Sequence, residues 1–398
     1  MSRPAPLTRP APLPASPTAP GALSSLPRWR HVLIGDAESP HLLKWARALA
    51  PQVELWVASS RGFATGFDGI VPSWRRLALG AEVAHGGDNL ALLKRLPELA
   101  RWLKEVDADW IHPHYLTSHG TLAWAAKLGW RLRGQLVASA WGSDILVTPH
   151  RHVAYRWVTR RVLRASRLCT SDSQHMAAEM RALGADEVRV FPFGLERMPP
   201  PATEKDPELY FSNRGLEPIY KPERVIASFA AIAAVRPAAR LIVANDGSLR
   251  DGLQAQARGL GVADRVKFVG RLDATAQDHW YARAQWYFSL PESDSVAVSV
   301  LEAMAHGCIP ILSDLPANHE LVRSGDNGLI LANGCLPKID ALYLLADLGR
   351  QAPRIAHENR SWVLQHGLFA PAVSSLLARL RELTPPIPHR PEPTDPAR

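Results

Sequence analysis

Strand-like apolar segments alternate with helix-like segments along most of this chain, and no other feature limits the fold as strongly. The first unit has a predicted strand, His31 to Gly35, a predicted helix from about Leu42 to Leu49, and a second strand, Val53 to Ala58. A strand, a helix and a strand within about 30 residues form a βαβ unit, whose two strands are parallel. The unit therefore predicts an α/β fold with a parallel sheet.

The same alternation continues through two halves of the chain. The expected strands include Trp110 to Pro113, Gln135 to Ala140 and Val188 to Phe191 in the first half, and Leu209 to Ser212, Ala239 to Ala244 and Val266 to Val269 in the second. Between the halves, Pro199 to Pro207 has the Pro, Glu and Lys content that is typical of a linker. We expect two consecutive Rossmann-like domains, which normally hold their ligand in the cleft between them.

The length of 398 residues fits two domains of ordinary size. We place the first domain at residues 29–198, a linker at 199–207, the second domain at 208–365, and a C-terminal helix that packs back on the first domain at 366–384. Residues 1–28 and 385–398 are rich in proline, and we expect both to be disordered extensions. The first of them has no apolar central region, so a signal peptide is not expected.

Cysteine usage and hydropathy favour a cytoplasmic protein. Cys169, Cys308 and Cys335 are widely spaced and odd in number, which indicates a reducing compartment without a disulfide framework or a zinc cluster. No apolar segment approaches the roughly 20 residues that span a bilayer.

Part of the net charge of +8 comes from a single segment of the chain. No acid lies between Asp144 and Asp172, whereas the segment 151–167 contains Arg151, Arg156, Arg160, Arg161, Arg164 and Arg167 among apolar residues. A solvated basic helix face is the first interpretation, and a surface that meets anionic lipid or a lipid-linked substrate at the inner face of the membrane is the second. A nucleic-acid partner is not expected, because no reading motif accompanies the segment.

Two acids in the segment Pro291 to Pro310 have an informative spacing. On one continuous helix, Asp294 and Glu302 would lie roughly 12 Å apart along the axis and about 80° apart around it. If Asp294 lies in the loop before the helix and Glu302 on its second turn, both can face one ligand over the helix N-terminus, which suits a phosphate. The plainer interpretation is an exposed loop acid and a Glu on a solvated helix face.

The loop after the first strand is a second candidate for a binding surface. It lacks a GxGxxG motif, so the usual dinucleotide fingerprint is absent, and Asp36, Ser39 and His41 line it instead. His112 and His114 bracket another strand end, where ligands lie in open α/β sheets. A metal site is not expected, since no third ligand has suitable spacing.

Further candidates follow strands of the second half. Arg214 could bind a phosphate through two hydrogen bonds, whereas Lys221 would act as a point charge. The turn at Asp246 and Gly247 could approach a phosphate as well. For each of these residues, simple solvation at the surface is the alternative.

Taken together, these segments resemble the retaining GT-B glycosyltransferases, in particular the large family 4 group that uses nucleotide sugars. The matching pieces span about Asp36 to Leu331 and are DAESPHLLKWARALA, ADWIHPHYLTSHG, ASAWGSDILVTPHRHVAYRW, VFPFGLE, SNRGLEPIY, NDGSLRDGL, VKFVGRL and PESDSVAVSVLEAMAHGCIPI. The resemblance implies the GT-B fold and transfer of a sugar, with retained configuration, to a glycan, lipid-linked or small-molecule acceptor, as in polysaccharide biosynthesis. It implies no metal and no other cofactor.

The resemblance also assigns roles to residues of the second domain. Glu302 would bind the ribose hydroxyls, Asp294 the transferred sugar, and Arg214 the diphosphate, with Lys221 as a second cation. The remaining donor-binding residues would be Asp246, Gly247, Gly270, Arg271 and the loop Ser295, Val296, Ala297 and Val298. On the acceptor side, His114 and Asp144 would orient the acceptor, beside Asp36, Ser39, His41, His112 and Trp141.

The chain departs from the family pattern at three places. Asp294 stands where Glu is more usual, Ser295 to Ala297 replaces a glycine-rich run, and Trp141 stands where many relatives have His. Two other functions therefore stay open: a nucleotide-sugar epimerase of the same fold, and a catalytically silent protein that binds sugar nucleotides.

Overall fold

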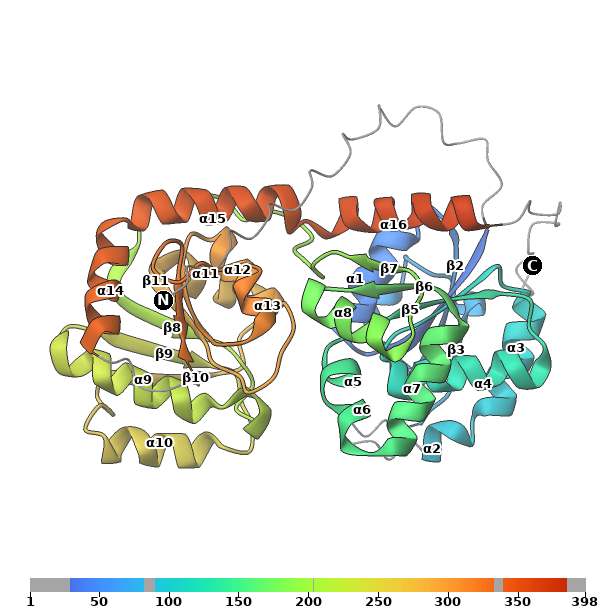
Figure 1. Ribbon diagram of the computed structural model, residues 1–398, viewed down its shortest axis with the longest axis horizontal. Helices are drawn as coiled ribbons and strands as arrows, with labels where there is room; N and C mark the ends of the chain where they lie inside the picture. The colour runs from blue at the N-terminus through green and yellow to red at the C-terminus, as the bar shows by residue number, and fades with distance from the viewer. Residues whose placement is uncertain (1–28, 82–89, 203, 333–338, 385–398) are drawn as a thin grey trace, which may run out of the picture.

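The computed structural model describes residues 29–81, 90–202, 204–332 and 339–384. These residues form two α/β domains that lie side by side, each built around one parallel sheet with helices on its faces (Figure 1). The extensions at 1–28 and 385–398, as well as Cys335, lie outside the described residues. Cys169 and Cys308 are buried free thiols.

The first domain contains a seven-stranded sheet of order β3-β2-β1-β4-β5-β6-β7, and every neighbouring pair is parallel. Its strands are β1 (Arg30–Ala37), β2 (Glu54–Phe63), β3 (Arg76–Ala78), β4 (Trp110–Pro113), β5 (Gln135–Ser139), β6 (Ser166–Ser171) and β7 (Val188–Val190). Its helices are α1 (Pro40–Leu49), α2 (Leu90–Leu93), α3 (Leu96–Val106), α4 (Thr121–Trp130), α5 (Ser143–Leu146), α6 (Thr148–Arg151), α7 (Val153–Ala165) and α8 (Gln174–Leu183).

The second domain contains a six-stranded parallel sheet of order β10-β9-β8-β11-β12-β13. Its strands are β8 (Asp206–Ser212), β9 (Arg240–Ala244), β10 (Val266–Gly270), β11 (Ala284–Ser289), β12 (Ile309–Ser313) and β13 (Leu329–Leu331). Its helices are α9 (Pro222–Val235), α10 (Arg250–Gly259), α11 (Ala274–Arg283), α12 (Val298–Ala305), α13 (Pro316–His319), α14 (Ile339–Arg350) and α15 (Ala352–His366), and α16 (Phe369–Leu383) follows them.

The strand order reverses once in each sheet. The first strand of each domain, β1 or β8, lies between its sequence successor on one side and the fourth strand, β4 or β11, on the other. Ligands of open α/β sheets bind outside the carboxyl ends of the strands at such a reversal. The loops that follow β1, β4, β8 and β11 are therefore the places to look for a site.

The chain crosses between the domains twice, and the two crossings lie side by side. The amide of Leu195 donates to the carbonyl oxygen of Gly367 at 2.7 Å, and the amide of Phe369 donates to that of Leu195 at 2.9 Å. A Cβ at Gly194 would lie 1.8 Å from the carbonyl oxygen of Gly367, so this close approach requires glycine. The two crossing segments, 193–195 and 367–369, are therefore paired through their backbones, and we call them the hinge strip.

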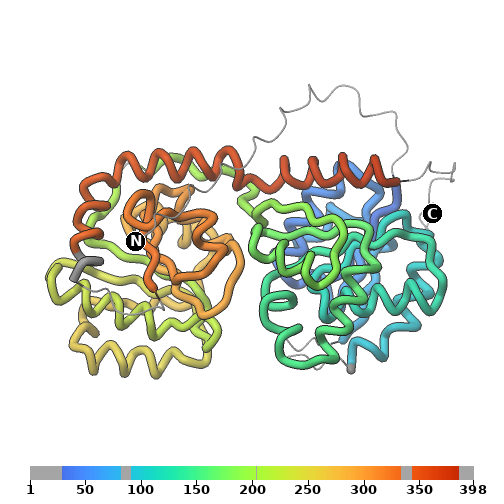
Figure 2. Tube along the Cα trace, in the orientation of Figure 1, coloured from blue at the N-terminus to red at the C-terminus, as the bar shows by residue number. Residues whose placement is uncertain are grey.

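Helix α16 lies along the first domain, although it follows the second domain in the chain (Figure 2). Its buried residues Val373, Leu376 and Leu380 join the apolar cluster around Trp45 of α1. Within the described residues, none of the helices has both the length and the apolar character needed to cross a bilayer.

Candidate functional site

The two acids of the segment 291–310 lie on opposite sides of a helix start. Asp294 is in the loop between β11 and α12, Ala297 is the N-cap, and Glu302 lies on the second turn of α12. The hydroxyl of Tyr281 donates to Glu302 Oε2 at 3.1 Å. Burial raises the pKa of Glu302, and the Tyr281 hydrogen bond and the charge of Lys44 oppose that rise.

Arg214 and Asp294 form a close ion pair at the end of β8. The guanidinium donates to Asp294 Oδ2 at 2.6 Å and to Ser299 Oγ at 3.2 Å, and it lies over the ring of Tyr220, 4.5 Å from its centre. Burial raises the pKa of Asp294, while the charge of Arg214 lowers it. A diphosphate that enters the site would replace Asp294 as the anion that faces Arg214.

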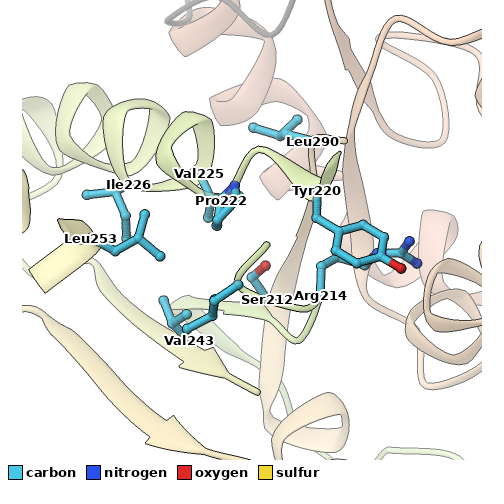
Figure 3. A pocket seen from close by; sticks show the side chains of 10 residues that line it. Ser212, Arg214, Tyr220, Pro222, Val225, Ile226, Val243, Leu253 and Leu290 are labelled. Atoms are coloured by element: carbon cyan, nitrogen blue, oxygen red, sulfur yellow. The ribbon is translucent and has the colours of Figure 1, made fainter. Parts of the chain in front are cut away.

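Figure 3 shows how Arg214 and Tyr220 are supported. Their stacked side chains lie at one end of a group whose other members, such as Val225, Ile226 and Leu253, come from the apolar side of α9 and α10. The cavity between them has a volume of about 10 Å³, which leaves no room for a nucleotide. It is a small packing void beside the stacked pair.

Sequence reasoning missed a polar network beneath these groups. Asn213 donates to the Tyr281 hydroxyl at 2.8 Å and accepts from the Tyr287 hydroxyl at 2.7 Å. Tyr281 in turn holds Glu302. Asn213 directly precedes Arg214 at a strand end, which is a signal that sequence reasoning could have used, whereas nothing in the local sequence marks the tyrosines.

The other predicted donor-side residues also follow strand ends. Asp246 pairs with Arg250 at 3.5 Å, and a Cβ at Gly247 would lie 2.5 Å from the carbonyl oxygen of Leu216, so the two loops touch. The carbonyl oxygen of Gly270 accepts from the Asn245 amide at 2.6 Å. Asp246, Gly247, Gly270 and Arg271 therefore lie at the carboxyl ends of the neighbouring strands β9 and β10, and we call this edge the rim. Lys221 pairs with Glu292 at 3.0 Å.

The loop after β1 faces this arrangement from the first domain. Ser39 caps α1 by accepting from the His41 amide, and Asp36 accepts from the Glu38 amide. The His41 ring is accessible to solvent but lies in the cleft, where partial desolvation and then the charges of Lys44 and Arg214 lower its pKa. His41 also meets the Trp141 ring edge-on, with the ring centres 4.9 Å apart.

Lys44 is a cleft residue that sequence reasoning missed. Its ammonium group donates to the carbonyl oxygens of Phe193 and Gly194 in the hinge strip. Burial lowers its pKa to about 8, and the charges of Glu196 and Glu302 oppose that shift. Lys44 thus binds the hinge strip through hydrogen bonds, and its positive charge interacts with Glu302 on α12.

The structure does not support the assignment of Asp144 and His114 as groups that orient an acceptor. Asp144 is fully buried, and its carboxylate accepts from the amides of Leu116 at 2.8 Å and Trp141 at 2.9 Å. Burial raises its pKa to about 6. Because both oxygens accept from backbone amides, the Asp144 carboxylate holds two loops together. An acceptor cannot reach it in this conformation.

The histidines of this strand end are packed inside the first domain. His114 accepts from the Trp141 indole at 3.1 Å, and His112 lies between His31 at 3.0 Å and Ser139 at 2.7 Å. Desolvation lowers the pKa of both predicted histidines well below the usual value. They are neutral core groups, and the sequence could not show that burial.

The loop ahead of α12 is buried between the second domain and the first. Ser295, Val296 and Ala297 are 2%, 5% and 7% exposed, and Val298 packs against the cluster that includes Trp141. The Val296 amide lies near the carboxylate of Asp172 in the first domain and lowers the pKa of that carboxylate. The expectation that the backbone of this loop meets the donor stays a prediction.

Helix α7 forms an exposed basic surface away from these loops. Val153 is 81% exposed and Trp157 is 51% exposed, and the guanidinium of Arg161 lies over the Trp157 ring. Among the residues that the structure describes, no group of three or more His, Cys, Asp or Glu is arranged to hold a metal ion.

Comparison with known proteins gives matches in both domains. Residues 196–342 match the family model of glycosyl transferases group 1, and residues 32–173 match the glycosyl transferase 4-like model. D-inositol 3-phosphate glycosyltransferase 2 of Catenulispora acidiphila is 26% identical over 317 residues, which cover 69% of this chain and 72% of that protein. N-acetyl-alpha-D-glucosaminyl L-malate synthase of Bacillus anthracis is 25% identical over 276 residues, covering 65% and 70%.

Solved structures share the two-domain architecture. Anabaena HepE in complex with UDP and glucose has a TM-score of 0.71 at 16% identity, with 89% of this chain and 100% of that chain covered. Sucrose-phosphate synthase from Thermosynechococcus elongatus has a TM-score of 0.68 at 17% identity, covering 89% and 99%. The expected arrangement of two Rossmann-like domains is confirmed.

Proposed function

The chain belongs to the glycosyl transferases group 1 and has the GT-B fold, and from this premise we propose that its cleft transfers a sugar from a nucleotide-sugar donor to an acceptor hydroxyl. The acceptor would be a glycan, a lipid-linked sugar or a small molecule. The observation that carries the proposal is the placement of Glu302 and of the Arg214–Asp294 pair around the start of α12. Because related structures contain UDP or UDP-glucose, uridine diphosphate is the first probe.

Each residue of the site has a defined part in the proposal. Glu302 accepts from the ribose hydroxyls, and Asp294 accepts from a hydroxyl of the transferred sugar. Arg214 binds the diphosphate, with Lys221 as a second cation if it leaves Glu292. The base lies beside the rim at Gly270 and Arg271, where β10 ends.

The proposed chemistry depends on stabilising the leaving group. As the bond between the anomeric carbon and the diphosphate oxygen breaks, negative charge grows on the diphosphate, where Arg214 and the start of α12 can stabilise it. The acceptor hydroxyl attacks from the same face, and its proton passes to the departing phosphate oxygen. The sugar keeps its configuration, and the products are a glycoside and a nucleoside diphosphate.

The reaction is proposed to need no metal, because Arg214 supplies the positive charge at the diphosphate. Initial rates of nucleoside diphosphate release should therefore change by less than about twofold when EDTA is added to metal-free buffer. Added Mg²⁺ should not restore turnover to an Arg214→Ala variant. A loss of more than tenfold on chelation, reversed by a divalent cation, would contradict this part of the proposal.

A thermal-shift screen of nucleotide sugars, followed by a transfer assay, tests the function. A ligand that binds only the folded state raises the melting midpoint, so the best donor should give the largest shift. That donor is then incubated with and without a panel of acceptors. Conversion of the donor alone to an epimer would indicate an epimerase. Binding without transfer would indicate a catalytically silent binding protein, which is the alternative suggested by Trp141 in place of the usual His.

The basic surface of α7 supports a second part of the proposal, namely contact with anionic lipid at the cytoplasmic face of a membrane. The face combines exposed arginines with the apolar side chains of Val153 and Trp157. Arginine near such a surface contributes about 1 kcal/mol to binding. Lipid contact would bring a lipid-linked acceptor to the cleft.

Vesicle binding checks this surface. The substitutions Arg156→Gln, Arg160→Gln and Arg161→Gln should weaken co-sedimentation with vesicles containing about 30% phosphatidylglycerol by at least about tenfold at low salt. The control combines Arg258→Gln, Arg283→Gln and Arg350→Gln, which remove the same charge from the second domain and should have little effect. Equal losses in both variants, or no binding by the parent, would contradict the assignment.

A further inference from the structure

The loop ahead of α12, Pro291–Ala297, is held by the first domain as well as by its own, and we call it the donor loop. Ser295 Oγ contacts Asp172 Oδ1 in a short hydrogen bond and lies 2.7 Å from Ser173 Oγ. Asp172 is 6% exposed, while Ser173 and Ser295 are 0% and 2% exposed. These groups are 122 to 123 residues apart in the chain, so the contact exists only while the domains face one another.

The hydrogen bonds of this contact have a defined direction. Ser173 is the N-cap of α8, and its hydroxyl oxygen accepts from the Met176 amide at 3.1 Å. That leaves its hydroxyl hydrogen to donate to Ser295, which donates in turn to Asp172. The nearby Val296 amide also lowers the pKa of Asp172. The two residues that follow β6 therefore hold the Ser295 side chain of the donor loop.

A second contact joins the two domains close by, and here the second domain supplies the carboxylate. Glu320, at the end of α13 in the second domain, accepts from the amides of Gln174 and His175 at 2.8 Å each. These amides belong to the first turn of α8, where a carboxylate is favoured by the free N–H groups and the helix dipole. Each domain thus contributes one carboxylate that accepts hydrogen bonds from the other domain.

The contact bears directly on the donor site. Ser295 directly follows Asp294, which pairs with Arg214, and it precedes the start of α12 by three residues. A shift of Ser295 therefore moves the Asp294 carboxylate and the helix end that the proposed function assigns to the donor.

We propose that Asp172 and Ser173 are positioning residues that fix the donor loop in its donor-binding shape only when the two domains are closed. Neither residue touches the donor in this assignment. The consequence for transfer rests on the proposed function, whereas the contact itself can be measured without any ligand.

Domain closure should also be coupled to a proton. Burial raises the pKa of Asp172 to about 8, the Ser295 hydrogen bond opposes that rise, and the nearby charge of Asp294 adds to it. Asp294 is itself paired with Arg214, and Glu320 of α13 accepts from the amide of His175, three residues after Asp172. Opening would return Asp172 to water and to its ordinary, lower pKa. The closed form therefore binds the proton more tightly, so closure is favoured at low pH and weakens as the pH rises toward about 8.

Hydrogen exchange of the full-length protein without ligand tests the contact. We expect Asp172→Ala and Ser295→Ala to lower the protection factors of the donor-loop amides by at least about tenfold. Asp172→Asn should retain the contact, since an amide can still bond Ser295, but should remove the pH dependence of protection between pH 6 and 8. The control is Asp186→Asn, an exposed aspartate between α8 and β7. Circular dichroism melting confirms that each variant is folded.

A parallel calorimetric titration with UDP separates this inference from the proposed function. If protection falls in Asp172→Ala while the parent does not bind UDP, the positioning role stands and the proposed donor is wrong. If the parent binds UDP and Asp172→Ala changes neither loop protection nor UDP affinity, the inference is overturned. A pH dependence of loop protection that persists unchanged in Asp172→Asn would overturn the proton coupling.

Discussion

Replacing Glu302 by alanine is expected to weaken the binding of UDP by about 100-fold. In our account its carboxylate accepts from two ribose hydroxyls, and hydrogen bonds to a charged group contribute about 1.5 kcal/mol or more each, so that about 3 kcal/mol is lost. The structure places Glu302 on the second turn of α12, with the Tyr281 hydroxyl to hold its orientation. Isothermal titration calorimetry with UDP measures the effect.

The matched control for Glu302 is Glu105→Ala, which removes an exposed glutamate from α3 and should leave UDP affinity unchanged. Glu302→Gln keeps the shape but loses the charge, and an intermediate affinity is expected. If Glu302→Ala bound UDP as tightly as the parent, the donor site would have to lie elsewhere.

Replacing Arg214 by alanine should lower turnover by about 100- to 1,000-fold, the range seen when one preorganised transition-state donor is removed. The guanidinium is partly buried, stacked on Tyr220 and paired with Asp294 at 2.6 Å, so it is already fixed where the diphosphate charge would develop. Its removal would also leave the partly buried Asp294 carboxylate without its cation, which should raise the Asp294 pKa further. Initial rates of nucleoside diphosphate release give the turnover.

Two comparisons make the Arg214 experiment specific. UDP affinity should fall in Arg214→Ala, whereas the affinity for uridine, which has no phosphate, should not. Arg214→Lys should restore only part of the rate, because an ammonium group keeps the charge but cannot form two parallel hydrogen bonds. Equal losses for UDP and uridine would mean that Arg214 supports the fold of the site and does not bind the diphosphate.

Local pattern was sufficient to predict the alternation of strands and helices and the loop position of Asp294. Parallel strands linked by helices have short apolar segments at regular intervals, so the two sheets could be derived from the sequence. The position of Asp294 followed from geometry, because two acids eight residues apart converge only if the helix starts between them. The start of α12 at Val298 meets that condition.

Burial and contacts between the domains could not be predicted in the same way. Asp144 and His114 follow strand ends, which favours function, yet both are enclosed by their own domain. Asp172 reaches Ser295 across 123 residues of sequence, and Lys44 is placed by the crossing segments at Phe193 and Gly194. Such contacts depend on how two separately folded domains face each other, and no periodicity in the sequence encodes that.

The central claim is that the cleft transfers a sugar from a nucleotide to an acceptor, and a mass-balanced transfer reaction tests it most directly. The full chain is incubated with the donor that stabilises it most and with a panel of glycan, lipid-linked and small-molecule acceptors. Our account predicts one nucleoside diphosphate released for each glycoside formed, with the anomeric configuration of the donor retained in the proton NMR spectrum. An inverted product, or an epimerised donor in the absence of any acceptor, would contradict it.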